Sequence, residues 1–191
     1  MEQNKEMTAQ ESLNLISEMM NNSRRSVLQN NSKGFILWGV LLTVMSLVVY
    51  FTWHFTGSAA WNFLWFLMPV IGYPLAIFIY KKDKNVPRNF VGKTIGQVWS
   101  AFGCFSIVLS ALGCTLVPIP ITFTIILLLG LAECVSGIIL KNWPIIIGGF
   151  LLGVCGAVLS TMLVNETQIL LFTLGGVILA ITGIVVKLQY K

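Results

Sequence analysis

The sequence predicts an all-α integral membrane protein, a six-helix bundle preceded by a cytoplasmic amphipathic helix. Three observations predict it: the composition, six long apolar stretches, and the placement of the basic residues. The chain is 56% hydrophobic and only 10% charged, whereas soluble domains carry about 25% charged residues. So few charges cannot cover a water-exposed surface, so we expect most of the exterior to face the lipid bilayer.

Six apolar stretches are long enough to span a membrane. A hydrocarbon core about 30 Å thick requires about 20 residues of helix. The expected spans are 35–53, 61–80, 94–117, 121–140, 143–163 and 169–186. Pro118 and Pro120 separate the third from the fourth, because a proline in a helix interior breaks the helix. The chain therefore divides into a cytoplasmic amphipathic segment, 1–34, and a six-span transmembrane domain, 35–191.

The basic residues predict the orientation of these spans. All 12 Lys and Arg precede the first span, lie between spans two and three or four and five, or follow span six. Every one is thus expected on the same side of the membrane. Cytoplasmic loops are enriched in Lys and Arg, so both termini are expected in the cytoplasm. The net charge of +5 is then a topology signal, and no nucleic-acid partner is expected.

The N-terminal segment has the pattern of an amphipathic helix. Thr8–Glu11 matches a capping box, in which a threonine hydroxyl and a glutamate bond the free amides of a helix start. A helix over 9–29 gathers apolar residues on one face, and residues 29–34 are expected to break it before the first span. The apolar face is Leu13, Ile16, Met20, Val27 and Leu28. Such a helix lies on the cytoplasmic leaflet, or it docks a cytoplasmic protein or a second copy of the chain.

This segment also carries a resemblance to known proteins. The run Glu11–Met20, followed by Leu37-Trp38-Gly39 at the opening of the first span, resembles a family of small bacterial multi-pass membrane proteins without an established activity. The resemblance covers about the first quarter of the chain. It implies a multi-pass protein of the bacterial inner membrane and implies no chemistry.

Glu133 is the only ionisable residue deep inside an expected span. Gly130 and Gly137 flank it on one helical face, and small residues mark the faces where membrane helices approach each other, so Glu133 is expected to face the bundle interior. Counting along the helices places four further polar residues in about the same layer. They are Thr43, Tyr73, Ser100 and Thr182. Glu133 is then either an uncharged, hydrogen-bonded structural residue or a proton or sodium site of a transporter.

Two glycine and proline patterns have structural interpretations. Pro69 and Pro74 are expected to kink the second span beside Tyr73, and broken helices line substrate sites in some transporters. Gly149 and Gly153 are four residues apart, which is typical of close helix packing.

Enzymatic function is not expected. The sole histidine, His54, lies in an outer connection, and no further ligands could complete a metal site with it. No cofactor motif is present. Two hypotheses remain: a non-enzymatic signalling or assembly module that uses the N-terminal helix and the basic loop 81–93, and a small secondary transporter or channel that uses Glu133.

Overall fold

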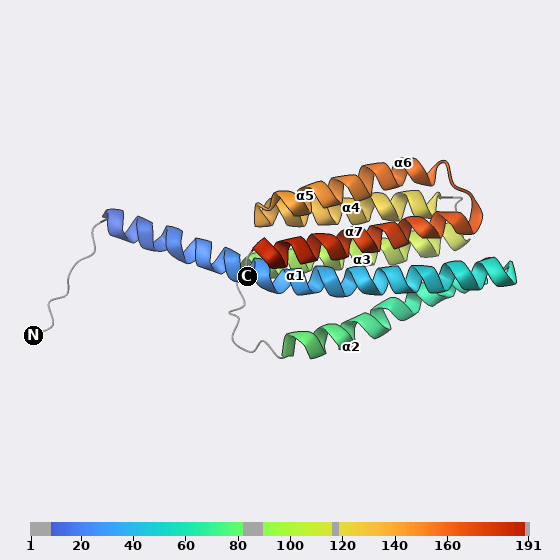
Figure 1. Cartoon of the computed structure of the whole chain (residues 1–191), viewed down its shortest axis with the longest axis horizontal. Coiled ribbons are helices and arrows are strands. Elements are labelled where there is room, and N and C mark those ends of the chain that lie inside the picture. The colour runs from blue at the N-terminus through green and yellow to red at the C-terminus, as the bar shows by residue number, and fades with distance from the viewer. Residues whose placement is uncertain (1–8, 82–89, 116–118, 190–191) are drawn as a thin grey trace, which may run out of the picture.

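The computed structural model describes residues 9–81, 90–115 and 119–189, and the regular secondary structure within these ranges is entirely helical (Figure 1). Six helical segments of the described chain are long and apolar enough to cross a membrane. They are Ser32–Thr56, Ala59–Ile79, Val91–Gly113, Ile121–Leu140, Trp143–Ser160 and Asn165–Gln189. The all-α, six-span architecture expected from the sequence is confirmed.

The first helix, α1, is one uninterrupted helix of 48 residues, Ala9–Thr56. The expected break at 29–34 is therefore wrong. Leu28, Ser32 and Phe35 follow one another on one face and are buried, with Leu28 and Phe35 in a hydrophobic cluster of the bundle. Burying a leucine stabilises by about 2 kcal/mol, whereas a glycine such as Gly34 costs a helix about 1 kcal/mol. Packing therefore outweighs the weak helix propensity of this stretch.

The remaining spans are built from one to three helical pieces each. The second span is the 3-10 helix η1 (Ala59–Phe66) followed by α2 (Leu67–Lys81), and the third and fourth are α3 (Phe90–Thr115) and α4 (Ile121–Leu140). The fifth joins α5 (Trp143–Phe150), the π-helical turn η2 (Leu151–Cys155) and α6 (Gly156–Ser160). The sixth is the 3-10 helix η3 (Asn165–Ile169) followed by α7 (Leu170–Gln189).

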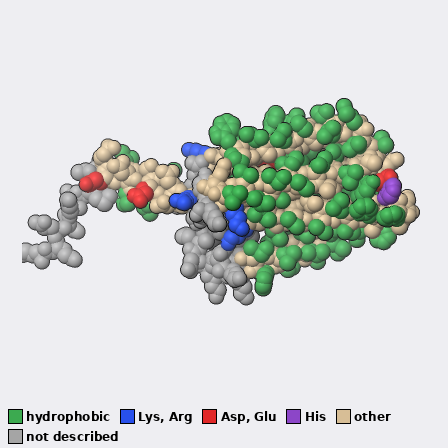
Figure 2. Space-filling model, viewed as in Figure 1, with side chains coloured by type: hydrophobic (Ala, Val, Ile, Leu, Met, Phe, Trp, Pro, Cys, Tyr) green, Lys and Arg blue, Asp and Glu red, His purple; other side chains and the backbone are tan. Residues whose placement is uncertain are grey.

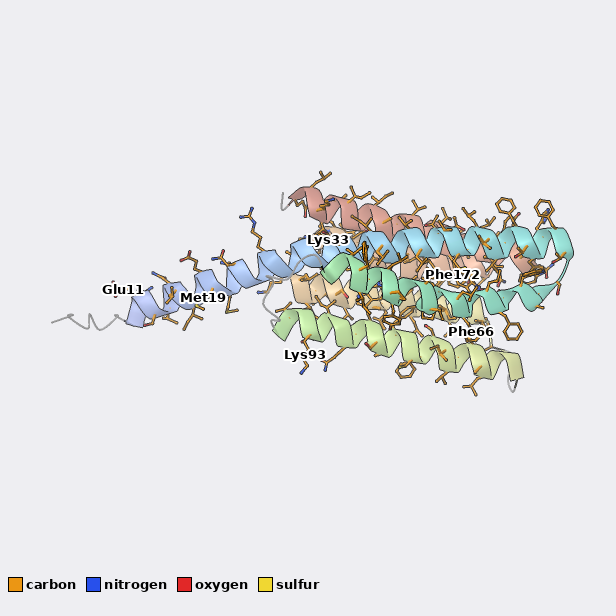
Figure 3. The ribbon with its side chains drawn as sticks, turned by 90° about the horizontal axis from the view of Figure 1, so that it is seen from below. Glu11, Met19, Lys33, Phe66, Lys93 and Phe172 are labelled. Atoms are coloured by element: carbon orange, nitrogen blue, oxygen red, sulfur yellow. The ribbon has the colours of Figure 1, made fainter. Side chains whose placement is uncertain are left out.

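Five helices form a closed ring of neighbours, and α2 packs against α1. In spatial order α2 contacts α1, α1 contacts α7, α7 contacts α5, α5 contacts α4, α4 contacts α3, and α3 returns to α1. Two hydrophobic clusters fill the interior: one includes Phe35, Leu140 and Val186, and the other Leu42, Ile126 and Phe172. Figure 3 shows α1, α2 and α3 from below, with Phe172 behind them.

The two ends of the bundle differ in charge. Lys33 and Lys93 lie at the end from which the N-terminal part of α1 leaves the bundle (Figure 3). Lys141 caps α4, and Lys187 lies in the last turn of α7. The amide of Asn142 donates to the Gln189 side chain at 3.2 Å, which joins the start of α5 to the end of α7. Figure 2 shows Lys and Arg at this basic end, His at the opposite end, and apolar side chains over the surface between them.

Candidate functional site in the bundle core

Glu133 of α4 lies in the centre of the bundle, between α5 and α7. Its exposed fraction is 0%. A Cβ atom placed on Gly148 of α5 would lie 2.6 Å from the Thr182 hydroxyl oxygen and 2.9 Å from Glu133 Oε1. The carboxyl of α4 and the hydroxyl of α7 therefore occupy the space that a side chain at position 148 would fill, and three helices converge there.

The Glu133 carboxyl has no geometrically sound hydrogen bond within the described part of the chain. Both of its oxygens are buried without a partner. A charge at such depth costs on the order of 3 kcal/mol even on insertion scales. Thr182 is 5% exposed and is the hydroxyl that faces the carboxyl across Gly148, so it is the group with which a small adjustment of rotamers would form a hydrogen bond.

A second polar contact lies one helical turn along α4. Ser136 is fully buried, donates to the Ala132 carbonyl at 2.7 Å, and accepts from the indole Nε1 of Trp99 on α3 at 3.1 Å. Sequence reasoning missed this pair. A serine three residues after Glu133 on the same face was the available signal, because residues three apart on a helix are neighbours.

Of the four polar residues expected near Glu133, only Thr182 lies beside it. The Thr43 hydroxyl donates to the Gly39 carbonyl at 2.8 Å, where α1 packs against α7. Tyr73 is 60% exposed, and its ring packs edge-on against Trp38 at 5.7 Å between centroids. Ser100 is exposed and donates to the Gly96 carbonyl at 2.8 Å. None of the contacts described for Thr43, Tyr73 and Ser100 is with the Glu133 carboxyl, because depth along a span does not fix the direction of a side chain.

The four glycines singled out as packing residues lie where α4 meets the fifth span. A Cβ on Gly130 would overlap the backbone of Gly153 and lie 2.5 Å from the Gly149 carbonyl oxygen. A Cβ on Gly149 would lie 2.5 Å from the Cys134 amide nitrogen, and one on Gly137 would lie 2.7 Å from the Ile146 amide nitrogen. Backbone-to-backbone contact of this kind holds α4 against α5 and η2, beside the Glu133 carboxyl.

A second glycine contact, between α1 and α7, was not among the expected packing residues. A Cβ on Gly39 would lie 2.5 Å from the Ala180 amide nitrogen, and one on Gly176 would lie 2.6 Å from the Gly39 carbonyl oxygen. Further along the same helix pair, the Ser46 and Thr173 hydroxyls share a hydrogen bond of 2.8 Å. The first and last spans are thus locked together by small residues and one polar bond.

At the end opposite the lysines, a pocket of about 330 Å³ opens to the surface. Its lining residues are Trp53, His54, Gly57, Ala59, Asn165 and Glu166. His54 Nδ1 lies 3.4 Å from Glu166 Oε1, which links the end of α1 to η3. This pocket contains none of the residues around Glu133. In the ranges that the structure describes, no three His, Cys, Asp or Glu side chains come together as a metal site would require.

Comparisons with protein-family models, with curated proteins and with solved structures find no match for this chain. The resemblance of its first quarter to small bacterial multi-pass proteins therefore stays a prediction, and the function is argued from the geometry above.

Proposed function

We propose that this chain is a non-enzymatic assembly or signalling module of the bacterial inner membrane that acts through the N-terminal part of α1. The observation that carries the proposal is the continuity of α1 from Ala9 to Thr56. Residues 9–27 of α1, here called the projecting segment, extend beyond the basic end of the bundle (Figure 1). The span that follows would transmit any contact made by this segment directly into the bundle.

The apolar face of the projecting segment has no partner among the described residues of the chain. Leu13, Ile16 and Met20 are 61%, 54% and 67% exposed, and Leu15 and Met19 are exposed beside them. Exposed apolar patches of this kind mark interaction sites. An amphipathic helix that ends in a groove or pairs with another helix is a common recognition mode.

A lipid surface is a poorer fit for this face than a protein. Met20 precedes the first residue of the span, Ser32, by 12 positions, which is about 18 Å at 1.5 Å per residue. Because the helix does not turn at the membrane surface, its apolar residues stand away from the bilayer. An interfacial helix would instead lie in the membrane plane.

The cytoplasmic position of both termini rests on the charge of the basic end. Lys33, Lys93, Lys141 and Lys187 belong to one end of the bundle, and loops rich in Lys and Arg are retained in the cytoplasm. The same end faces the negatively charged lipids of the inner leaflet. The greater part of the basic loop 81–93 lies outside the described residues, so the proposal rests on α1.

A transporter that uses Glu133 is the second candidate function. In its favour, a buried carboxyl that has no hydrogen-bond partner among the described residues is the kind of group that a translocated proton or cation would bind. Against it, Glu133 has no exposed surface, and the second span, which carries Tyr73, packs against α1. Proton or sodium flux into liposomes that is lost in Glu133→Gln would favour this candidate, and absence of flux with the native chain would remove it.

The assembly proposal is tested by the mass of the native particle in mild detergent or nanodiscs. The full chain should form a particle heavier than one chain of 21.1 kDa. The triple variant Leu13→Gln, Ile16→Gln, Met20→Gln should reduce it to a single chain, while Asn14→Gln with Asn21→Gln on the opposite face should not. A native chain that is itself a single-chain particle in both media contradicts the proposal.

A further inference from the structure

We propose that the partner of the projecting segment is a second copy of this chain, and that the two segments pair as a short, parallel, in-register coiled coil. This inference rests on the proposed function and names its partner. It follows from the spacing of the apolar and charged residues, and from the constraint that the membrane places on two copies of one continuous helix.

Three exposed apolar residues of the projecting segment have the spacing of a seven-residue pattern. Leu13, Ile16 and Met20 are separated by three and then four positions, which is the spacing of the a and d positions of a coiled coil. All three are exposed. Along the sequence, Ala9 occupies the preceding d position, Ser23 the following one, and Val27 the next a position.

Three of the four charged residues of the segment follow the same period on the opposite face. Glu11, Glu18 and Arg25 are each seven positions apart, and in this register all three occupy the f position, which points away from a partner helix. Like charges on two identical helices would therefore lie as far apart as the pair allows. A helix with an apolar face and charged residues on the opposite face has the pattern of a helix that pairs with another helix. A helix exposed to water on all sides would not need such a face.

The positions that flank the seam permit identical helices to pair. Charges at the e and g positions usually determine which partner a coiled-coil helix chooses. Uncharged residues occupy four of these positions here: Gln10 and Ser17 at e, and Ser12 and Met19 at g. The third e position of the segment is Arg24 in the sequence, and the g position opposite it in a parallel pair carries the uncharged Met19. No like charges are opposed.

The membrane fixes the orientation and register of the pair. Two copies insert with the same topology, so their projecting segments leave the same face of the bilayer side by side and parallel. Residues 9–27 are only a little longer than the about 12 to 15 residues below which an isolated helix is marginal in water. Here the helix is already formed by continuity with the span, and confinement to one membrane raises the effective concentration of the partner.

The test is disulfide cross-linking in the membrane. In a chain in which Cys104, Cys114, Cys134 and Cys155 are replaced by alanine, single cysteines are introduced as Leu13→Cys, Ile16→Cys and Met20→Cys, with Glu11→Cys, Glu18→Cys and Arg25→Cys as matched controls. All six positions are exposed, so none of the substitutions removes a buried side chain. Mixing chains that carry two different tags identifies covalent pairs of two copies.

Disulfides require Cα atoms within about 7 Å of each other, so the seam positions should cross-link about tenfold faster than the outward positions under mild oxidation. Equal rates at both sets, or faster pairing at the outward set, overturn the inference. A native particle heavier than one chain that is reduced by the glutamine triple variant, yet gives no seam cross-links between copies, means that another protein occupies the face. In that case self-pairing fails and the proposed function stands.

Discussion

The Glu133 carboxyl of α4 and the Thr182 hydroxyl of α7 meet over Gly148 of α5, because a side chain at position 148 would occupy the space of both. Because Gly148 has no side chain, α5 leaves room for the buried carboxyl between α4 and α7. This relationship makes the core of the bundle sensitive to one methyl group.

Gly148→Ala should destabilise the folded bundle. Its Cβ would lie 2.6 Å from the Thr182 oxygen and 2.9 Å from Glu133 Oε1, and inserting a methyl group into a packed core costs about 1 to 3 kcal/mol. Thermal unfolding in detergent should therefore occur at a lower temperature than for the native chain. Gly103→Ala is the matched control, since its added Cβ would have no atom of another described helix within 4 Å. Equal losses in the two variants would contradict the description of this site.

Glu133→Gln should insert and fold like the native chain. The amide has nearly the shape of the carboxyl, and it removes a charge whose burial costs on the order of 3 kcal/mol. Glu133→Lys, which brings in a longer side chain and the opposite charge, should reduce the amount of folded protein recovered from membranes. The measurement is the recovery of monodisperse protein by size-exclusion chromatography. Loss of the glutamine variant would mean that the negative charge itself holds the helices together.

Gly130→Ala should be more damaging than Gly153→Ala, although both residues belong to one helix contact. A Cβ on Gly130 would overlap the backbone of Gly153, whereas a Cβ on Gly153 would lie 3.2 Å from the Cα of Gly130. We expect a loss of about 3 kcal/mol for the first and about 1 kcal/mol for the second. Unfolding in increasing denaturing detergent can rank the two, and the reverse order would show that α4 meets η2 differently.

The hydrogen bond between Ser46 and Thr173 should couple the stability of α1 to that of α7. Its two oxygens are 2.8 Å apart, and Ser46 is fully buried. Hydrogen bonds between membrane helices contribute about 0.6 kcal/mol on average. A double-mutant cycle with Ser46→Ala and Thr173→Val should give a coupling energy of about that size. Additive effects of the two substitutions would show that the bond contributes nothing to the packing of this helix pair.

The spans could be predicted from the sequence because the bilayer imposes their length and composition. Every expected span overlaps one of the six found in the described chain, and the fourth, Ile121–Leu140, has the same bounds. Hydropathy and charge placement carry this information within the sequence itself. Which face of each helix packs against its neighbours is harder to predict from the sequence, because lipid-facing and buried positions are both apolar.

Two features could not be predicted from the sequence: the continuity of α1 through residues 29–34 and the surroundings of Glu133. Polar residues and a glycine suggested a break, but Leu28 and Ser32 pack into the bundle and keep the helix intact. Counting residues along the spans correctly predicted that Thr182 lies at the depth of Glu133. It could not show that Tyr73 and Ser100 point outward, because the direction of a side chain depends on which helices are neighbours.

The most direct test of the account is the distance between Glu18 and Phe51 on α1, measured by pulsed electron paramagnetic resonance. Spin labels at these two exposed positions, in nanodiscs and diluted with unlabelled chain so that only the intramolecular pair is seen, should be about 50 Å apart for one continuous helix at 1.5 Å per residue. A helix that breaks near Ser32 and lies flat on the membrane would give roughly 35 Å from the same rise. The longer distance supports a projecting segment, and the shorter one contradicts it together with the assembly function built on it.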